Sequence, residues 1–473
     1  MVRNILISPV WLTAIAVVAS LVFCITLTMS GISSATSILA GRSDYYEAYF
    51  SGFTPVRALV NTAYICLGIL YVIWFFQKKT VALKLQTIVK YARPFLVLAF
   101  IAYPQSTDVY LYLQYGLMGL NKINPYLNPA NSFNSVVSPL IEWSQTSTYG
   151  PITQLFFMAA AWVAPISPIL GVYLFKLFCL AIHVSNACLV WRLLGASAWQ
   201  NKLTMAYLMN PILLNEHVVN AHVDVYLCNV LLILMGCLFN RFYIESILVG
   251  VAGFLTKTLP LIWLPLMVGF LVYRRRWREL AIAALLSAGV IIFLSYTLLP
   301  TVEAWKSLLN PGVKGLTARS IHHLFNIALG YLTGFDLQQR QGIISNLSLL
   351  TTLGFFGYYA WTLLLPKLKP NYSEVNLAID IGWTTLVLFL FATPWLMPWY
   401  PTILLPIAIV CRCRDRFFFL TSFTFSLSLG IIYGTGGGQS LLSAIASLTS
   451  IGPAIALILL RKQAISSSVA QKI

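Results

Sequence analysis

The sequence predicts an all-α membrane protein that crosses the bilayer many times. Of its 473 residues, 59% are hydrophobic and only 9% are charged, whereas a soluble domain carries about 25% charged residues. The mean hydropathy is +0.81. Apolar stretches of about 16 to 24 residues recur from end to end, each long enough for the hydrocarbon layer of a bilayer. Inside that layer the backbone must satisfy its own hydrogen bonds, which favours helices.

The basic residues predict the topology. Lys and Arg gather in short joints between the apolar stretches, and such joints are expected on the cytoplasmic side. Placing all of them on one side predicts about fourteen spans, with both termini inside and residues 1–473 forming a single transmembrane domain. The first stretch resembles a signal peptide, but its full spanning length favours an uncleaved helix. The joints contain Lys78, Lys79, Lys84, Lys90 and Arg93; Arg192 and Lys202; Arg241; Arg274, Arg275, Arg276 and Arg278; Lys367 and Lys369; Arg412, Arg414 and Arg416; and Arg461 and Lys462.

This register fixes which segments face the outer side. The outer face then carries 31–54, a large loop at 108–167, turns at 220–221 and 257, a second loop at 300–343, the joint Trp395–Trp399 and a Gly-rich turn at 434–439. The segment Pro151–Pro165 is apolar but bracketed by prolines. We expect it to lie in the outer interface, with a plain buried helix as the alternative. The predicted spans are 10–30, 55–77, 93–107, 168–191, 203–219, 222–240, 243–256, 258–273, 279–299, 344–365, 376–395, 398–411, 416–433 and 440–460.

Two classes of function are disfavoured by the distribution of side chains. The formal charge is +17, yet the cations separate apolar stretches and form no continuous patch, so no nucleic acid partner is expected. The eight cysteines fall in predicted spans or at their cytoplasmic edge, so the outer loops have no disulfides. Cys411 and Cys413 have no further Cys or His on that face, and a metal site there is not expected.

Carboxylates are scarce, and an unpaired charge at hydrocarbon depth costs a few kcal/mol or more. Asp108 follows the third predicted span, and Tyr112 and Tyr115 share one face of the helix after it. Such a carboxylate can bind or deprotonate a sugar hydroxyl. The alternative is an N-cap of a helix starting at Val109, with the tyrosines in an interfacial belt. The carboxylates of the predicted outer face are Asp44, Glu47, Asp108, Glu142, Glu216, Asp224, Glu303 and Asp336.

A second polar group lies in the stretch 215–224, NEHVVNAHVD. It places two carboxylates, two imidazoles and two amides between apolar segments, which is difficult to explain as packing. The spacing does not match a zinc site, so substrate or phosphate contacts are favoured. Helix capping by Asp224 is the alternative.

Cationic and aromatic residues complete the candidates. Lys257 lies between two short apolar runs, where it either snorkels to the headgroups or neutralises an anion. Arg319, His322 and His323 can join the same anion site or lie exposed in their loop. The aromatic joint that contains Trp399 fits an interface belt or a sugar-stacking groove.

In this order the motifs resemble a known family. Asp108–Tyr112, Asn124–Tyr126 and Tyr149–Pro151 resemble the DvyxY…G…NPY…YpP pattern of GT-C glycosyltransferases, and more narrowly bacterial mannosyltransferases that use polyprenyl-phosphate sugars. Asn220–Asp224, Lys257–Pro260 and Pro398–Tyr400 also match family-like patterns in the expected order. The likeness covers roughly residues 95–410. Gly150 is a departure, because many relatives have a double proline there, and this puts the acceptor side in doubt.

The resemblance implies a GT-C-like bundle with juxtamembrane helices in the first large outer loop, and it carries the catalytic role over to Asp108. It implies an inverting transfer of a hexose, mannose above others, from a polyprenyl-phosphate donor to a glycan or glycolipid. The expected place is the outer face of the plasma membrane, in contact with its lipids. The substrate-binding candidates are Tyr112, Tyr115, Asn124, Tyr126, Tyr149, Asn220, His222, Asp224, Lys257, Arg319, His322 and Trp399.

Several alternatives stay open. No metal ligand is assigned and no cofactor is required, although a divalent metal is left open. Glucose, galactose and arabinose donors compete with mannose. One competing function is a lipid-linked-sugar flippase or transporter, which the mid-span carboxylate Asp380 would favour. The other is a glycan ligase.

Overall fold

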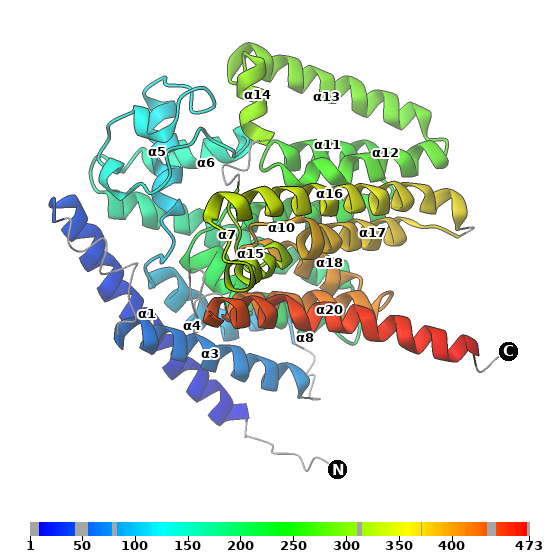
Figure 1. Cartoon of the computed structure of the whole chain (residues 1–473), viewed down its shortest axis with the longest axis horizontal. Coiled ribbons are helices and arrows are strands. Elements are labelled where there is room, and N and C mark those ends of the chain that lie inside the picture. Colours follow the sequence, from blue (N-terminus) through cyan, green and yellow to red (C-terminus); the bar gives the residue numbers. More distant parts are fainter. Residues whose placement is uncertain are drawn as a thin grey trace. The chain divides into compact units, whose positions relative to one another are not determined.

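In a computed structural model of the chain, residues 9–42, 55–77, 83–309, 315–369, 371–432 and 441–470 are described. Throughout these residues every regular element is a helix (Figure 1). The extended pairing among the described residues is limited to isolated β-bridges. The prediction of an all-α protein is therefore confirmed. Outside the described residues lie Asp44, Glu47, Lys78, Lys79 and the turn at 434–439, together with the side chains of Arg461 and Lys462.

Seven of the described helices are long and apolar enough to cross a membrane, so the chain is a membrane protein. The predicted count of about fourteen is not confirmed. The other predicted spans overlap shorter helices; α12 (Trp263–Tyr273), for example, has 11 residues and rises only about 17 Å. The seven are α1 (Pro9–Leu39), α3 (Pro55–Phe76), α7 (Pro168–Leu194), α13 (Trp277–Thr297), α16 (Leu337–Leu368), α17 (Glu374–Val387) with its extension Leu388–Ala392, and α20 (Leu441–Ala470).

Two predicted spans, 203–219 and 222–240, form one bent pair. The first comprises α8 (Gln200–Leu208), α9 (Pro211–Leu213) and the π-helix η3 (Leu214–Val219), and the second is α10 (Asp224–Phe239). The pair bends by 118° at the break between them. Taken as one broken span, it would raise the number of candidate spans to eight. The polar stretch 215–224 therefore contains most of η3, the break at 220–223 and the first residue of α10.

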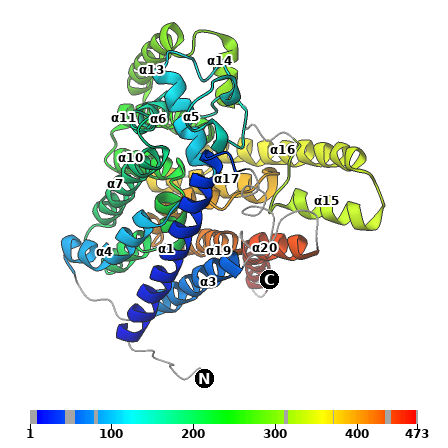
Figure 2. The same cartoon turned by 90° about the vertical axis from the view of Figure 1, so that its left-hand side faces the viewer.

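The chain divides into two compact units. The first contains residues 1–229, 254–258 and 290–310, and the second contains the rest. In the first unit α1 packs along α3, and α4 (Leu85–Ile101) contacts both α1 and α7. Helices α5 (Asp108–Leu120) and α6 (Pro151–Ala161) lie side by side in the segment 108–167 (Figures 1 and 2).

The pairing of α5 with α6 depends on a glycine. A Cβ atom at Gly116 would lie 2.2 Å from the carbonyl oxygen of Phe157, so only glycine allows this close approach. The rings of Tyr112 and Phe157 then stack with centroids 4.8 Å apart. Phe157 is buried, whereas Trp162, just after α6, is 74% exposed. Helix α6 thus has one buried side, and its place in the membrane interface stays a prediction.

The segment 300–343, which was predicted as an outer loop, contains helices. Within 300–343 the described residues include α15 (Ile321–Leu332) and the start of α16 at Leu337, while α14 (Val302–Leu309) belongs to the first unit. Polar side chains such as Asp336 cap the helices here: its carboxylate accepts from the Gln339 amide at 2.8 Å. The place of 300–343 as a second outer loop stays a prediction. Helix α1 continues to Leu39, nine residues past the predicted end at 30.

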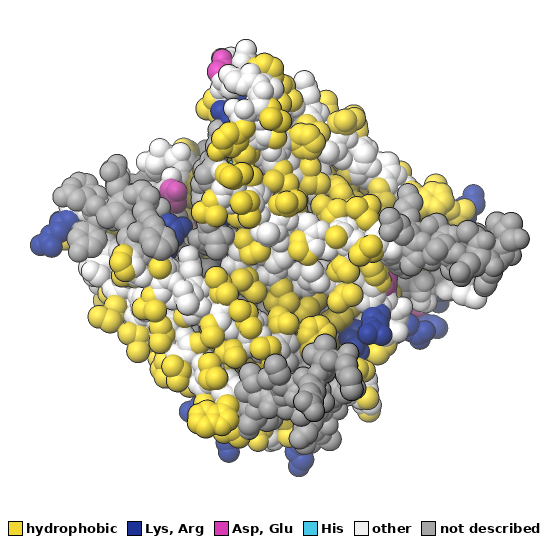
Figure 3. All heavy atoms as spheres, turned by 60° about the horizontal axis from the view of Figure 1, so that its bottom comes forward, with side chains coloured by type: hydrophobic (Ala, Val, Ile, Leu, Met, Phe, Trp, Pro, Cys, Tyr) yellow, Lys and Arg dark blue, Asp and Glu magenta, His cyan; other side chains and the backbone are white. Residues whose placement is uncertain are grey.

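Much of the described surface is apolar. In the view of Figure 3 hydrophobic side chains are spread widely, while Lys and Arg are confined to a few groups. Along α13, Leu285, Phe293 and Tyr296 are 74%, 64% and 85% exposed. Exposed apolar faces of this extent mark contact with lipid or with another protein.

Candidate active site

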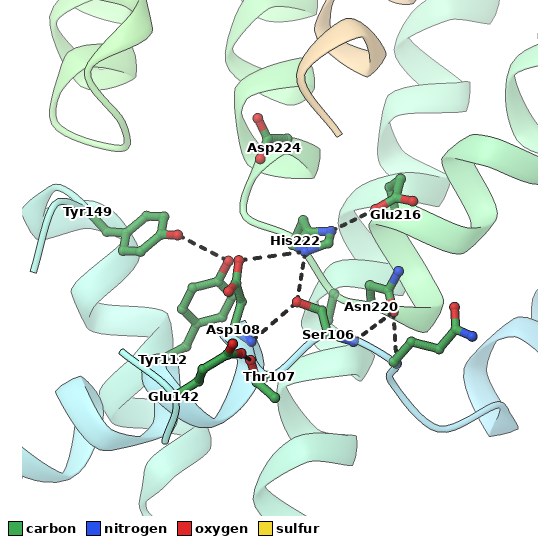
Figure 4. Close-up of polar contacts among 12 residues, drawn as sticks. Ser106, Thr107, Asp108, Tyr112, Glu142, Tyr149, Glu216, Asn220, His222 and Asp224 are labelled. Atoms are coloured by element: carbon green, nitrogen blue, oxygen red, sulfur yellow. Dashed lines mark hydrogen bonds and ion pairs between the residues drawn. The ribbon is translucent and has the colours of Figure 1, made fainter. Parts of the chain in front are cut away.

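Asp108 is the first residue of α5, and Thr107 stands at the N-cap position without a side-chain capping bond. The alternative interpretation of Asp108 as an N-cap is therefore wrong. Its carboxylate instead points to His222, with Oδ2 3.7 Å from Nε2 (Figure 4). The side chain keeps 18% exposure, so a ligand can reach a carboxylate that is otherwise enclosed by protein.

The turn before Asp108 is fixed by side chains from the break between η3 and α10. The Oδ1 atom of Asn220 accepts from the backbone amides of Gln105 at 3.0 Å and Ser106 at 3.4 Å. The Ser106 hydroxyl lies 3.2 Å from Nε2 of His222 and accepts from the Asp108 amide at 3.3 Å. Two segments about 115 residues apart in sequence thus hold one another (Figure 4).

His222 is held by Glu216. Its Nδ1 atom lies 2.9 Å from Oε2 of Glu216, and its backbone amide donates to the Glu216 carbonyl at 2.9 Å. Ala221 between them has a φ of 55°, a left-handed conformation that turns the chain back on itself. Asn215 donates to the other carboxylate oxygen of Glu216 at 2.8 Å. Because the carboxylate of Glu216 lies on the Nδ1 side of the ring, Nε2 faces Asp108.

The surroundings of Asp108 favour its protonated form. Burial raises the pKa of the Asp108 carboxyl above its usual 3.8, and the charges of His222 and Lys257 lower it in part. Nearby Glu142 and Asp224 oppose that lowering. A raised carboxyl pKa improves a general base, because proton transfer is most effective when the pKa lies near the operating pH.

Lys257 and Asp224, both predicted as substrate-binding residues, are each other's partners. The Lys257 Nζ atom lies 2.9 and 3.1 Å from the two carboxylate oxygens of Asp224. Asp224 is 2% exposed and Lys257 is 20% exposed. Asp224 begins α10, where a negative charge is also stabilised by the helix dipole. The ammonium group is thus anchored on one side and accessible on the other.

The segment carrying Lys257 is attached to the start of α6. Tyr149 and Lys257 form an antiparallel bridge, and the Gly150 amide donates to the Thr256 carbonyl at 3.0 Å. A Cβ atom at Gly150 would lie 2.0 Å from the carbonyl oxygen of Leu255. This contact explains the departure from the double proline, since any residue with a Cβ atom would clash here.

Two tyrosines line the same region. Tyr112 lies one turn after Asp108 on α5, and its hydroxyl is 3.3 Å from that of Tyr149 (Figure 4). Their rings meet edge to face at 5.0 Å. Burial raises the pKa of both hydroxyls, and the charge of Asp108 adds to the effect. Both therefore stay neutral and can donate hydrogen bonds to a ligand.

Three predicted residues, Tyr115, Asn124 and Tyr126, lie in the segment 108–167 and make contacts within the first unit. Tyr115 donates to the Gln145 carbonyl at 2.9 Å. Asn124 donates to the Leu298 carbonyl at 2.8 Å and accepts from the Tyr126 amide at 2.9 Å. Tyr126 is 1% exposed. These side chains shape the loop, and contact between them and a substrate stays a prediction.

Arg319, His322 and Trp399 belong to the second unit. Arg319 is 4% exposed, has a φ of 49°, and donates to the Ser443 carbonyl at 3.4 Å. His322 lies 2.9 Å from the Thr351 hydroxyl. The neighbouring Ala318 forms a parallel bridge with Trp395, so the loop and the aromatic joint are attached. Whether these residues take part in the site of Asp108 stays a prediction.

Four residues of the cluster were not among the predicted site residues: Ser106, Thr107, Glu142 and Glu216. The Thr107 hydroxyl donates to the Glu142 carboxylate at 2.8 Å. Glu142 and Glu216 were named only among the scarce carboxylates of the predicted outer face, while the two hydroxyl residues gave no signal apart from their position before Asp108. No group of three or more His, Cys, Asp or Glu placed to hold a metal occurs in the part of the chain that the structure describes.

One comparison with known proteins identifies a relative. The family model for the N-terminal domain of alpha-(1->6)-mannopyranosyltransferases, the MptA_B family, matches residues 14–273, more than half of the chain. The matched range contains Asp108, Glu216, His222 and Lys257, whereas Arg319 lies beyond it. No curated protein and no solved structure matches the chain.

Proposed function

This chain belongs to the alpha-(1->6)-mannopyranosyltransferase family, and from that premise we propose that it transfers mannose from a polyprenyl-phosphate donor to a hydroxyl group of a glycan or glycolipid, with inversion. Membership makes the protein a mannosyltransferase, which takes a sugar donor and a glycan acceptor. The lipid-phosphate donor, the α-1,6 linkage in this chain and the outer face of the plasma membrane are parts of the proposal. A β-linked donor would give an α-mannoside.

The observation that carries the proposal is the carboxylate of Asp108, partly exposed and backed by the His222–Glu216 pair. In the proposed step an acceptor hydroxyl gives its proton to Asp108 while its oxygen attacks the anomeric carbon from the face opposite the phosphate. The bond from that carbon to the phosphate oxygen breaks, and the lipid phosphate leaves with the electron pair. His222 lies where it can compensate the changing charge on Asp108.

Lys257 is the proposed contact for the leaving phosphate. Its ion pair with Asp224 fixes its position, while the exposed side of the ammonium can donate to a phosphate oxygen. A cation placed where negative charge develops lowers the barrier. Because the leaving group is already a phosphate ester, cationic side chains can stabilise it and the scheme uses no metal. Arg319 and His322, in the second unit, stay predicted anion-binding residues.

Tyr112 and Tyr149 are the proposed contacts for the sugars. Their neutral hydroxyls can donate to sugar oxygens, and aromatic rings offer apolar faces against which sugar rings stack. Trp399 is proposed for such stacking. The outer-face placement rests on the basic joints, which favour the cytoplasm.

The test is transfer by the full chain in lipid nanodiscs, with radiolabelled polyprenyl-phosphate mannose and an α-mannoside acceptor. Replacing Asp108 with Asn should lower kcat/KM by about 10²- to 10⁴-fold, as loss of a general base does. Glu303→Gln removes an exposed carboxylate of the same unit and should leave the rate unchanged. Wild-type transfer by the Asp108→Asn variant would overturn the assignment. Label that crosses a proteoliposome bilayer without leaving its lipid would favour the flippase.

A further inference from the structure

The first unit contains a cavity of about 310 Å³ that the proposed reaction does not use. It is bounded by α1, α3, α4 and the segment from α8 to η3. Along α3 its lining runs from Tyr64 to Trp74 and along α1 from Leu12 to Phe23, in each case about 15 Å at 1.5 Å per residue. Most of the lining is aliphatic or aromatic. An elongated apolar cavity between membrane helices has the shape and chemistry of an aliphatic chain.

One end of this cavity is polar. Asn215 lines it and is 7% exposed, and its Oδ1 atom has no hydrogen-bond partner among the described residues. The buried Tyr64 hydroxyl interacts with the side chain of Asn215, but neither the hydroxyl nor Oδ1 of Asn215 makes a hydrogen bond of full geometry within the described chain. Buried polar atoms nearly always have partners. Two incompletely bonded polar groups on residues that line one cavity are therefore matched by a ligand that carries a hydroxyl group.

The polar end leads to the candidate active site. Asn215 donates to Glu216 at 2.8 Å, Glu216 lies 2.9 Å from His222, and His222 lies 3.7 Å from Asp108. A ligand whose chain fills the cavity would thus hold its head beside the residues proposed to remove a proton. This places the ligand on the side of the reacting hydroxyl.

Charge separates the two lipids that the reaction would use. The polar end of the cavity adjoins the carboxylate of Glu216, and neither Lys nor Arg lines the cavity within the described residues. A phosphate would meet a like charge here and would find no cation, whereas Lys257 is not part of the lining. An uncharged head with hydroxyl groups meets no such repulsion.

We propose that this cavity binds the aliphatic chain of the mannosyl acceptor, an uncharged lipid with a hydroxylated head, and that Tyr64 and Asn215 bind its first hydroxyl groups. The inference rests on the proposed function. It implies that the polyprenyl chain of the donor binds outside this cavity. It also makes the acceptor a lipid rather than a free glycan.

The first test compares chains on the acceptor, in nanodiscs without alkyl detergent. Octadecyl α-mannoside should have a KM at least tenfold below that of methyl α-mannoside. Ala16→Trp fills the cavity from α1 and should remove this advantage without changing the KM of the donor. Ala14→Trp, on the exposed side of the same helix, should retain it. A rise in donor KM alone, or no change in either KM, would overturn the proposal.

The second test measures binding without turnover, in the Asp108→Asn variant. An alkyl α-mannoside with a diazirine at the chain end should label residues of α1 or α3, and Ala16→Trp should abolish the labelling. An alkyl phosphate probe of equal chain length should label at least tenfold less, and Glu216→Gln should narrow the difference. Stronger labelling by the phosphate probe would overturn the proposal. Labelling without mannosyl transfer by the wild type would reject the function and keep the lipid site, whereas transfer without labelling would reject the site alone.

Discussion

The imidazole of His222 and the carboxylate of Glu216 form a buried pair, with Nδ1 and Oε2 2.9 Å apart and the two side chains 1% and 3% exposed. Neither residue can be replaced without leaving the other buried and without its partner. Unpaired buried polar groups are costly, so this pair fixes the orientation in which Nε2 faces Asp108.

Glu216→Gln should lower kcat by about 10-fold or more while the donor KM stays near its wild-type value, because buried polar networks are worth more than their single contacts. The amide keeps the shape of the side chain but removes the negative charge beside Nδ1. The measurement is steady-state transfer at saturating acceptor, with thermal unfolding to show that the variant is folded. If Glu216→Gln and Glu216→Ala lost kcat only in proportion to their loss of thermal stability, the role of Glu216 would be structural only.

The pH dependence follows from the raised pKa of Asp108. A base must be deprotonated, so kcat/KM should fall as the pH decreases through the folded-state pKa of this carboxyl, at a pH above its usual 3.8. Lys257 lowers that pKa, so Lys257→Met should move the acid limb of the profile to higher pH. A profile whose acid limb does not move in Lys257→Met would assign it to a different group.

The same shift predicts the stability of the Asp108→Asn variant. A carboxyl whose pKa is higher in the folded than in the unfolded chain stabilises the fold below the unfolded pKa. That contribution is lost as the pH rises through the folded pKa. At a pH above the folded-state pKa the charged carboxylate therefore destabilises the fold, and there Asp108→Asn should unfold at the wild-type temperature or above it. Unfolding at a clearly lower temperature would show that the carboxylate stabilises this turn.

The sequence predicted the helices well and their number of crossings poorly. Apolar stretches such as 168–191 became long helices, because about 20 apolar residues span a bilayer without help. The stretch 203–219 was also apolar, but Pro211 and the π-helix after it divide the segment. Composition alone does not distinguish a bent pair from two full spans.

The candidate site was predicted in part for a similar reason. Asp108, His222, Asp224 and Lys257 were recognisable because charged groups are rare in this chain and costly near a membrane. That Lys257 would pair with Asp224 depends on the bridge between Tyr149 and Lys257, a contact across more than 100 residues. Local sequence carries no signal for such a contact.

The ion pair of Lys257 and Asp224 predicts different losses of stability for two substitutions of Lys257. Lys257→Met leaves Asp224, which is 2% exposed, without its cation, and breaking a buried pair costs about 3–5 kcal/mol. Lys257→Arg keeps the charge and should retain more stability. In the proposed function Lys257→Met also raises the donor KM, and Lys257→Arg raises it less. Denaturant unfolding and donor titration measure the two effects, and an unchanged donor KM in Lys257→Met would remove this residue from the phosphate site.

Gly150→Ala should disturb the attachment of the Lys257 segment. The added Cβ atom would lie 2.0 Å from the Leu255 carbonyl oxygen, and such overpacking costs about 1–3 kcal/mol. Gly289→Ala is the control, because a Cβ atom there meets nothing within 4 Å in the described part of the chain and a helix gains about 1 kcal/mol from the change. The melting temperature should fall in Gly150→Ala and rise in Gly289→Ala. The transfer rate should fall in Gly150→Ala. Equal behaviour would mean that the segment around Lys257 can shift without cost.

Lys176 should support the active site from a distance. It lies within α7 and is fully buried, and its ammonium group donates to the carbonyls of Ala99, at 3.3 Å, and Ala102 at the end of α4. A cation at a helix C-terminus is favourable, and the chain leaving α4 here leads within six residues to Asp108. Lys176→Met removes a donor from two buried carbonyls, at a cost of about 1–3 kcal/mol each.

The expected result for Lys176→Met is a lower kcat with unchanged KM values, since the turn that presents Asp108 loses its anchor while Lys176 is not among the proposed substrate contacts. Lys202→Met is the matched control: Lys202 is also buried and donates to a backbone carbonyl, that of Gln77, but it lies on α8, away from the turn. It should lower the melting temperature and leave kcat unchanged. Lys176→Arg should restore part of kcat, because a guanidinium can reach the same carbonyls. Equal kcat values in Lys176→Met and Lys202→Met would show that Lys176 only stabilises the fold. Both variants should lose stability, and only a positioning role of Lys176 predicts an additional loss of kcat in Lys176→Met.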